Sequence, residues 1–339
     1  MKRPTLKDVA ADVGMSISCT ARALKGRPGF PTETYLKVRE AADRLGYSPD
    51  PMLAALSAYR LSKNPRSFQG TLAFIANGSK AAALGSREMG DLYQGAEERA
   101  NSLGYRLEYF DLGTNRKAHD QMWRVIRARG IPGGLIRSFP RPIEEIYFPL
   151  SEFMGIDLFS SPHFKVLPTV SSYHAQSMEE VSGELLTRGY RHPGLILTQG
   201  LNSYLFYGWW MGFTANAPRF PHASTLLNAD QLSPAEQDKW AREKGVDVLI
   251  YCISENIIPK KIPGGKKVDV VCMDLIHPEC GVTGIHQNRF QAGAIAVEWL
   301  QSILITARMG MVRAPHAMMV PGVWHEGSTL RRKPLLQGV

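Results

Sequence analysis

The first fifty residues carry three short stretches in which apolar positions recur with a helical period. The first has its apolar positions at Leu6, Val9, Ala10 and Val13. Thr5 and Asp8 have capping-box spacing, so this helix is predicted to begin after Thr5 and to end at Gly14.

The next two stretches continue the pattern. Ser16 is predicted to cap a helix over 17–24, whose apolar face is Ile17, Ala21 and Leu24. Glycines and a proline interrupt the chain at 26–29, and Thr32 is predicted to cap a third helix that ends at Gly46. A helix, a glycine turn and a second helix, completed by a third, are typical of a helix-turn-helix domain.

After this head, Asp50 and Pro51 favour the start of a helix that is too short to persist alone in water. Residues 60–66 are polar and basic and are interpreted as a linker.

From Thr71 onward, short apolar runs alternate with helical patterns. Strands are predicted near 71–76, 105–110, 133–137, 153–158, 193–198, 246–253, 268–273 and 317–321. Helices are predicted near 88–103, 119–129, 174–188, 203–215, 233–244 and 288–308. This alternation indicates parallel sheets covered by helices, and the length favours two α/β lobes. Ligands of such folds bind at the carboxyl ends of strands, so a ligand is expected in the cleft between the lobes.

The charge distribution sets the head apart from the rest. The chain of 339 residues has a formal net charge of +9, and residues 1–70 hold 12 Lys/Arg against 6 Asp/Glu. A basic head on a nearly neutral body suggests a polyanion partner, most simply nucleic acid, although a basic solvated face explains the charge alone equally well. No apolar run is long enough for a membrane span or a secretory signal, so the chain is expected in the cytoplasm, associated with the nucleoid.

Motifs for catalysis and metal binding are missing from the sequence. Gly264 to Lys267 lacks the spacing of a phosphate-binding loop, the nine histidines form no metal-binding motif, and no G-x-S-x-G elbow occurs. The four cysteines are interpreted as free thiols. The sequence therefore predicts a protein that is not an enzyme and has no metal or cofactor. The tail, 331–339, is too short for a tetramerising coiled coil, which favours a homodimer.

The whole chain resembles the LacI/GalR family of bacterial transcription regulators. The residues that carry the resemblance are Thr5 to Ala10, Gly14 to Ser16, Ala21 to Leu24, Ala41 to Pro49 and Leu53 to Leu56, with looser landmarks at Leu103 to Tyr105, Arg188 to Arg191 and Gln287 to Ala296. The resemblance implies a helix-turn-helix head (1–48), a hinge helix and linker (49–69) and a two-lobe body of the type I periplasmic-binding-protein fold (70–330). The N-lobe would comprise about 70–160 and 288–316, and the C-lobe about 161–287 and 317–330.

Candidate DNA contacts follow from the helix-turn-helix. The first residues of its second helix meet base edges in the major groove, here Ile17 and Ser18, with Arg22 one turn on. Ile17 offers an apolar contact to a thymine methyl, and Arg22 offers a bidentate fork to guanine. The alternatives are a core role for Ile17 and a phosphate contact or a solvated charge for Arg22.

Phosphate contacts are predicted for Thr5, Ser16 and Tyr47. The sequence departs from the family at Cys19-Thr20-Ala21, where Thr-Val-Ser is usual, so one phosphate contact is expected to be lost. Leu53 and Leu56 match the family's hinge, in which two symmetry-related leucines wedge into the minor groove and kink the DNA.

Candidate effector contacts are Asn77, Trp209 and Asp274. Asp274 ends a strand as the family's ligand-binding acid does, and Asn77 ends another; both residues have the alternative of an ordinary turn residue. Trp209 falls where the family often has an arginine. It either stacks on a sugar or fills the cleft.

The sequence thus predicts a dimeric repressor that binds a palindromic operator and responds to a small, sugar-like effector. Two alternatives stay open: an effector-independent regulator with a degenerate cleft, and a solute-binding module. The second of these predicts a secretory signal and no basic head, which is the reverse of what the sequence has.

Overall fold

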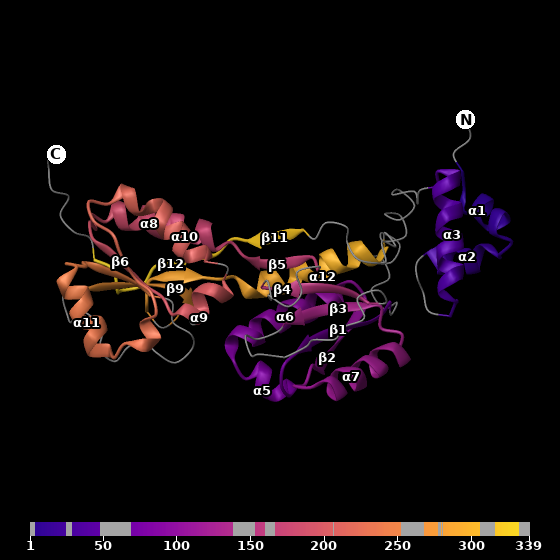
Figure 1. The fold of residues 1–339 in the computed structure, drawn as a ribbon, viewed down its shortest axis with the longest axis horizontal. Helices are drawn as coiled ribbons and strands as arrows, with labels where there is room; N and C mark the ends of the chain where they lie inside the picture. Colours follow the sequence, from indigo (N-terminus) through magenta and orange to yellow (C-terminus); the bar gives the residue numbers. More distant parts are fainter. Residues whose placement is uncertain are drawn as a thin grey trace. The chain divides into compact units, whose positions relative to one another are not determined.

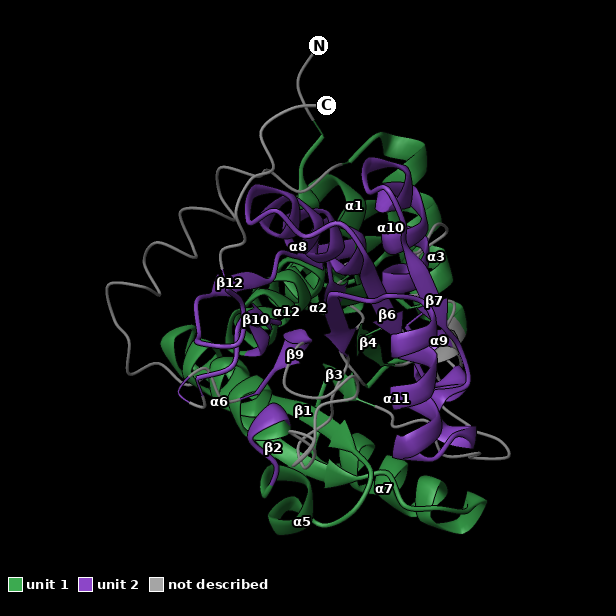
Figure 2. Cartoon of the chain, turned by 90° about the vertical axis from the view of Figure 1, so that its left-hand side faces the viewer, with its two compact units in different colours: residues 1–85, 89–170, 290–317 green, residues 86–88, 171–289, 318–339 purple. Residues whose placement is uncertain are grey.

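The computed structural model describes residues 4–24, 29–47, 69–137, 153–159, 167–205, 207–251, 268–276, 279, 281–305 and 316–331. Contacts divide the chain into two compact units (Figure 2). Unit 1 comprises Met1–Gly85, Met89–Val170 and Phe290–Ala317, and unit 2 comprises Ser86–Glu88, Ser171–Arg289 and Met318–Val339. The domain boundaries expected from the sequence stay predictions.

The head consists of α1 (Leu6–Val13), α2 (Ile17–Leu24) and α3 (Thr32–Leu45), shown in indigo in Figure 1. The predicted caps of the first two helices are confirmed. The Asp8 carboxylate accepts hydrogen bonds from the Thr5 backbone N–H and hydroxyl, both at 2.7 Å, and Ser16 Oγ accepts from the Cys19 N–H at 3.1 Å. Gly14 and Gly46 end α1 and α3 with the left-handed φ that glycine adopts without strain.

Two details of the head differ from the sequence prediction. The buried side of α2 is Thr20 and Ala23, whereas Ile17 is 49% exposed. The prediction took apolar residues as the core face, but the Thr20 hydroxyl donates to the Ser16 carbonyl oxygen at 3.0 Å, and this bond lets a threonine be buried. Thr32 is the first helical residue of α3, and Pro31 holds the capping position.

The first sheet has the strand order β11-β5-β4-β3-β1-β2. Its strands are β1 (Gly70–Ala76), β2 (Tyr105–Asp111), β3 (Gly133–Arg137), β4 (Met154–Leu158), β5 (Thr169–Ser172) and β11 (Ala317–Val320). The helices of this part of the chain are α5 (Lys80–Leu84), α6 (Arg87–Ser102), α7 (Arg116–Ala128) and α12 (Arg289–Ile305). Strands β1 to β5 pair in parallel, as predicted.

The second sheet has the order β12-β10-β9-β8-β6-β7. Its strands are β6 (Pro193–Ile196), β7 (Ser224–Leu226), β8 (Val248–Tyr251), β9 (Asp269–Leu275), β10 (Gly284–His286) and β12 (Val323–His325). Its helices are α8 (His174–Thr187), α9 (Gln199–Tyr204), α10 (Gly208–Asn216) and α11 (Pro234–Glu243), with single 3-10 turns at Ala217–Arg219 and Ala229–Gln231. The helix predicted over 203–215 is two helices, α9 and α10, which separate where Tyr207 has a left-handed φ of 59°.

Helices α6 and α12 approach each other at two glycines in unit 1. A Cβ atom on Gly95 would lie 1.9 Å from the Phe290 carbonyl oxygen, and one on Gly293 would lie 2.1 Å from the Leu92 carbonyl oxygen. Only glycine allows backbones to come this close. The two helices therefore form one tightly packed pair.

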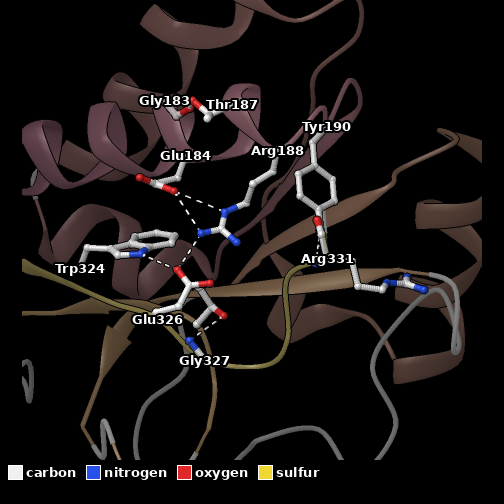
Figure 3. Close-up of polar contacts among 10 residues, drawn as sticks. Gly183, Glu184, Thr187, Arg188, Tyr190, Trp324, Glu326, Gly327 and Arg331 are labelled. Atoms are coloured by element: carbon white, nitrogen blue, oxygen red, sulfur yellow. Dashed lines mark hydrogen bonds and ion pairs between the residues drawn. The ribbon is translucent and has the colours of Figure 1, made fainter. Parts of the chain in front are cut away.

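Within unit 2, two polar clusters hold the C-terminal segment, 318–331, against the rest of the unit, and Figure 3 shows several of their residues. Arg188, at the end of α8, pairs with Glu184 at 3.2 Å and with Glu326 at 2.6 Å. In the second cluster, the hydroxyl of buried Tyr190 donates to Asp269 and accepts the Arg331 backbone N–H at 3.0 Å. The Arg331 guanidinium also pairs with Asp269, at 2.6 Å.

Tyr190→Phe should lower the free energy of unfolding of unit 2 by about 1–3 kcal/mol, because the buried Asp269 carboxylate and the Arg331 N–H each lose a hydrogen-bond partner. Urea denaturation measures the change. Tyr109→Phe is the control, since the Tyr109 hydroxyl donates to a carbonyl oxygen in a more exposed place. An equal effect of the two substitutions would contradict the assigned role of Tyr190.

Candidate functional site

The side of α2 that faces away from the head core presents the residues predicted to read bases. Ile17, Ser18 and Arg22 are all exposed and lie within one and a half turns of the helix. The Arg22 guanidinium carbon lies 5.5 Å from the centre of the Phe30 ring, a cation–π contact that orients the side chain. This surface combines an apolar group, a hydroxyl and a guanidinium, which are groups that match base edges in the major groove.

The residues predicted to contact phosphates lie around the same helices. The Ser16 hydroxyl accepts a bond within α2, so its own proton is left to donate. The Thr5 hydroxyl donates to Asp8, so a phosphate contact would compete with that carboxylate. Tyr47 is half-buried against the head core. Leu53 and Leu56 lie outside the described residues.

A partly buried ion cluster surrounds Asp274 in unit 2. One terminal nitrogen of Arg289 donates to both carboxylate oxygens of Asp274, at 2.7 and 2.8 Å, and Nε of Arg289 lies 3.4 Å from Glu88 Oε1. Arg289 is 6% exposed. Sequence reasoning missed Arg289. The helix dipole disfavours a cation at the first residue of a helix, so an arginine in this position indicates that acidic side chains lie close to it.

An aromatic pair lies beside this cluster. The rings of His174 and Trp209 meet edge to face, with their centres 5.0 Å apart. Burial and then the nearby Arg289 cation lower the pKa of His174 to about 4, so its ring is neutral at pH 7. Among the described residues, His174 Nδ1 and Trp209 Nε1 have no hydrogen-bond partner. Trp209 is only 2% exposed, so its ring fills space in the core of unit 2.

His174 makes the stability of unit 2 dependent on pH. Its pKa is lowered on folding, so the unfolded chain binds the proton more tightly. Stability should be complete above about pH 6.5 and fall by about 3 kcal/mol as the pH drops towards 4. Urea denaturation between pH 7 and 4 should show a shallower decline for His174→Gln than for the unchanged protein. Parallel profiles would contradict the assignment.

In unit 1, polar side chains gather at the carboxyl ends of three neighbouring strands. Asn77 follows β1, Arg137 ends β3 and Asp157 lies near the end of β4; Ala76 is in register with Arg137, and Ile136 with Asp157. Arg137 and Asp157 are 4% and 1% exposed. Asn77 Oδ1 is buried and has no hydrogen-bond partner among the described residues. Sequence reasoning found Asn77 but not the other two, because they lie within the strands predicted over 133–137 and 153–158, whereas Asn77 follows its strand.

Other kinds of site are not found in the part of the chain that the structure describes. That part holds no group of three or more His, Cys, Asp or Glu side chains able to bind a metal ion. It also has no helix with the length and apolar character needed to cross a membrane.

Solved structures of transcription regulators share this fold. The lac repressor dimer bound to operator and the anti-inducer ONPF has 17% identity and a TM-score of 0.53, covering 97% of this chain and 99% of that one. A LacI transcriptional regulator from Lactobacillus brevis has 18% identity and a TM-score of 0.55, covering 76% and 100%. The regulator CelR in complex with cellobiose has 16% identity and a TM-score of 0.50, covering 96% and 100%. No protein-family model and no curated protein sequence matches the chain.

The chain therefore has the architecture of a helix-turn-helix head joined to a body of two α/β sheets. This is the fold of LacI-family transcriptional regulators, as the sequence resemblance predicted.

Proposed function

We propose that this protein is a sequence-specific DNA-binding transcription regulator. The observation that carries the proposal is the exposed face of α2, on which Ile17, Ser18 and Arg22 project from a capped helix-turn-helix. It is supported by the surplus of basic residues in the head and by the operator complex of a protein with this fold. The protein acts by binding and not by catalysis.

The regulator binds a two-fold-symmetric operator as a homodimer and represses transcription. A symmetric pair of heads matches two half-sites, which is why palindromic operators suit dimers. The lac repressor of similar fold is a dimer on its operator. Thr5, Ser16 and Tyr47 position the head on phosphates, and Leu53 and Leu56 enter the minor groove.

A small, sugar-like effector modulates the regulator. Its candidate contacts in unit 2 are Asp274 and the polar groups beside it, and Asn77 is the candidate contact that unit 1 offers by itself. Cellobiose is bound by one protein of similar fold. Asn77, His174 and Trp209 each hold a buried polar atom with no hydrogen-bond partner in the described part of the chain, which favours a ligand, because buried polar groups are normally hydrogen-bonded.

An effector-independent regulator is the second candidate. It is favoured by the Asp274 carboxylate, which Arg289 already engages, and by the burial of Trp209. Thermal shifts of the full chain with cellobiose, lactose, glucose and galactose separate the two candidates. A saturable stabilisation by any of these sugars favours the effector-binding form, and unchanged melting with all four favours the second.

Selection from randomised duplexes tests the DNA-binding proposal. The full chain should enrich duplexes that contain an inverted repeat of one half-site. Recovery of unenriched DNA after repeated rounds would overturn the proposal.

A further inference from the structure

The ion cluster around Arg289 lies where two helices change units. Residues Ser86–Glu88 belong to unit 2 and the rest of α6 to unit 1; Arg289 is the last residue of its segment of unit 2, and α12 continues in unit 1 from Phe290 (Figure 2). Glu88 and Arg289 are thus the last residues of unit 2 before each helix passes into unit 1. The Arg289 guanidinium pairs with both Asp274 and Glu88.

The position of the cluster gives Asp274 an influence on both helices at once. Beyond the cluster, α6 and α12 pack backbone against backbone at Gly95 and Gly293, so they respond as a pair. In the chain, unit 1 includes the strand β1, the first strand after the head. A change in what Asp274 binds therefore reaches helices that belong to the same unit as that strand.

We infer that Arg289 is a positioning residue that couples ligand binding at Asp274 to DNA affinity. When no ligand is bound, Arg289 itself pairs with the Asp274 carboxylate. A ligand hydroxyl or amine that binds Asp274 must compete with Arg289. Release of Arg289 leaves Glu88 with an altered partner and loosens the first turns of α6 and α12. This inference rests on the proposed function.

The energetics favour a switch of this kind. Arg289 is nearly fully buried, its helix dipole disfavours a cation at the first residue, and two carboxylates compensate for both effects. When a ligand binds the Asp274 carboxylate, the buried Arg289 guanidinium loses one of its two compensating acids. A solvent-exposed ion pair would not be affected in this way, because water compensates its charges.

A mutant cycle on DNA affinity tests the inference without a ligand. The probe is the duplex that the unchanged protein selects from randomised DNA, and the variants are Asp274→Asn, Arg289→Gln and the double variant, all in the full chain. Each single variant should change the dissociation constant at least fivefold in the same direction, the lower end of ordinary allosteric couplings. The double variant should match each single variant, because the pair between Asp274 and Arg289 is broken in all three.

The control is Arg99→Gln. Arg99 pairs with Glu298 at 2.7 Å between the same two helices, and the two side chains are 38% and 51% exposed, against 7% for Arg289, so its loss should leave affinity within about twofold. Hydrogen exchange gives a second readout: the first turns of α6 and α12 should exchange faster in Asp274→Asn than in Arg99→Gln.

Each result decides the inference. Single variants within twofold of the unchanged protein, or effects that multiply in the double variant, would overturn it. If a single variant fails to fold, the double variant decides, since it removes one charge of each sign. Failure of the unchanged protein to select any duplex is a different result, which overturns the proposed function itself.

Discussion

Replacing Gly293 with alanine should lower the free energy of unfolding by about 3 kcal/mol. The added Cβ would lie 2.1 Å from the Leu92 carbonyl oxygen and 2.9 Å from the Ala96 nitrogen. Backbone atoms cannot rotate away as a flexible side chain does, so the α6–α12 pair must separate, at a cost typical of an overpacked core. Urea denaturation of the full chain measures the loss.

Gly183→Ala is the matched control, because Gly183 lies inside α8 and an added Cβ would meet no atom within 4 Å. That substitution should stabilise the protein by about 0.5–1 kcal/mol, the ordinary gain of alanine over glycine in a helix. If Gly293→Ala were also neutral or stabilising, the close helix contact described here would be wrong.

Replacing Arg22 with alanine should relax base preference at one position in each half-site. The loss should be about 1–3 kcal/mol of discrimination there, because a bidentate contact to guanine is worth that much. Competition among duplexes that each differ from the selected site at one position gives the preference at every position.

Arg44→Ala removes the same charge from the head and is the control. Arg44 pairs with Asp12 between α3 and α1, away from the exposed face of α2. It should leave the base preference unchanged. A uniform weakening by Arg22→Ala across all duplexes would instead assign Arg22 to a phosphate.

Much of the fold follows from the sequence, because long periodic segments and strong caps determine local structure. The capping box at Thr5 and Asp8 and the glycine that ends α1 are present as predicted. Four strands, β5, β7, β10 and β12, were not predicted. They are three or four residues long, which is too short to show a pattern of apolar and polar residues. The break between α9 and α10 was also missed, because it depends on the backbone of Tyr207.

The candidate sites divide in the same way. Exposed positions on α2 follow from the spacing of a helix-turn-helix, a local property. Asp274 pairs with Arg289 of α12, 15 residues away in the sequence, and Arg289 pairs in turn with Glu88 at the start of α6, 186 residues from Asp274. No local pattern brings these three residues together. The burial of Trp209 likewise depends on α8 packing against α10.

Equilibrium competition at physiological ionic strength tests the central claim, that the head recognises a symmetric duplex. The full chain should bind its selected duplex about a thousandfold more tightly than a scrambled duplex of equal length. Scrambling one half-site should remove most of that difference, because a dimer then loses half of its base contacts. Equal affinity for the selected, half-scrambled and fully scrambled duplexes would contradict the claim.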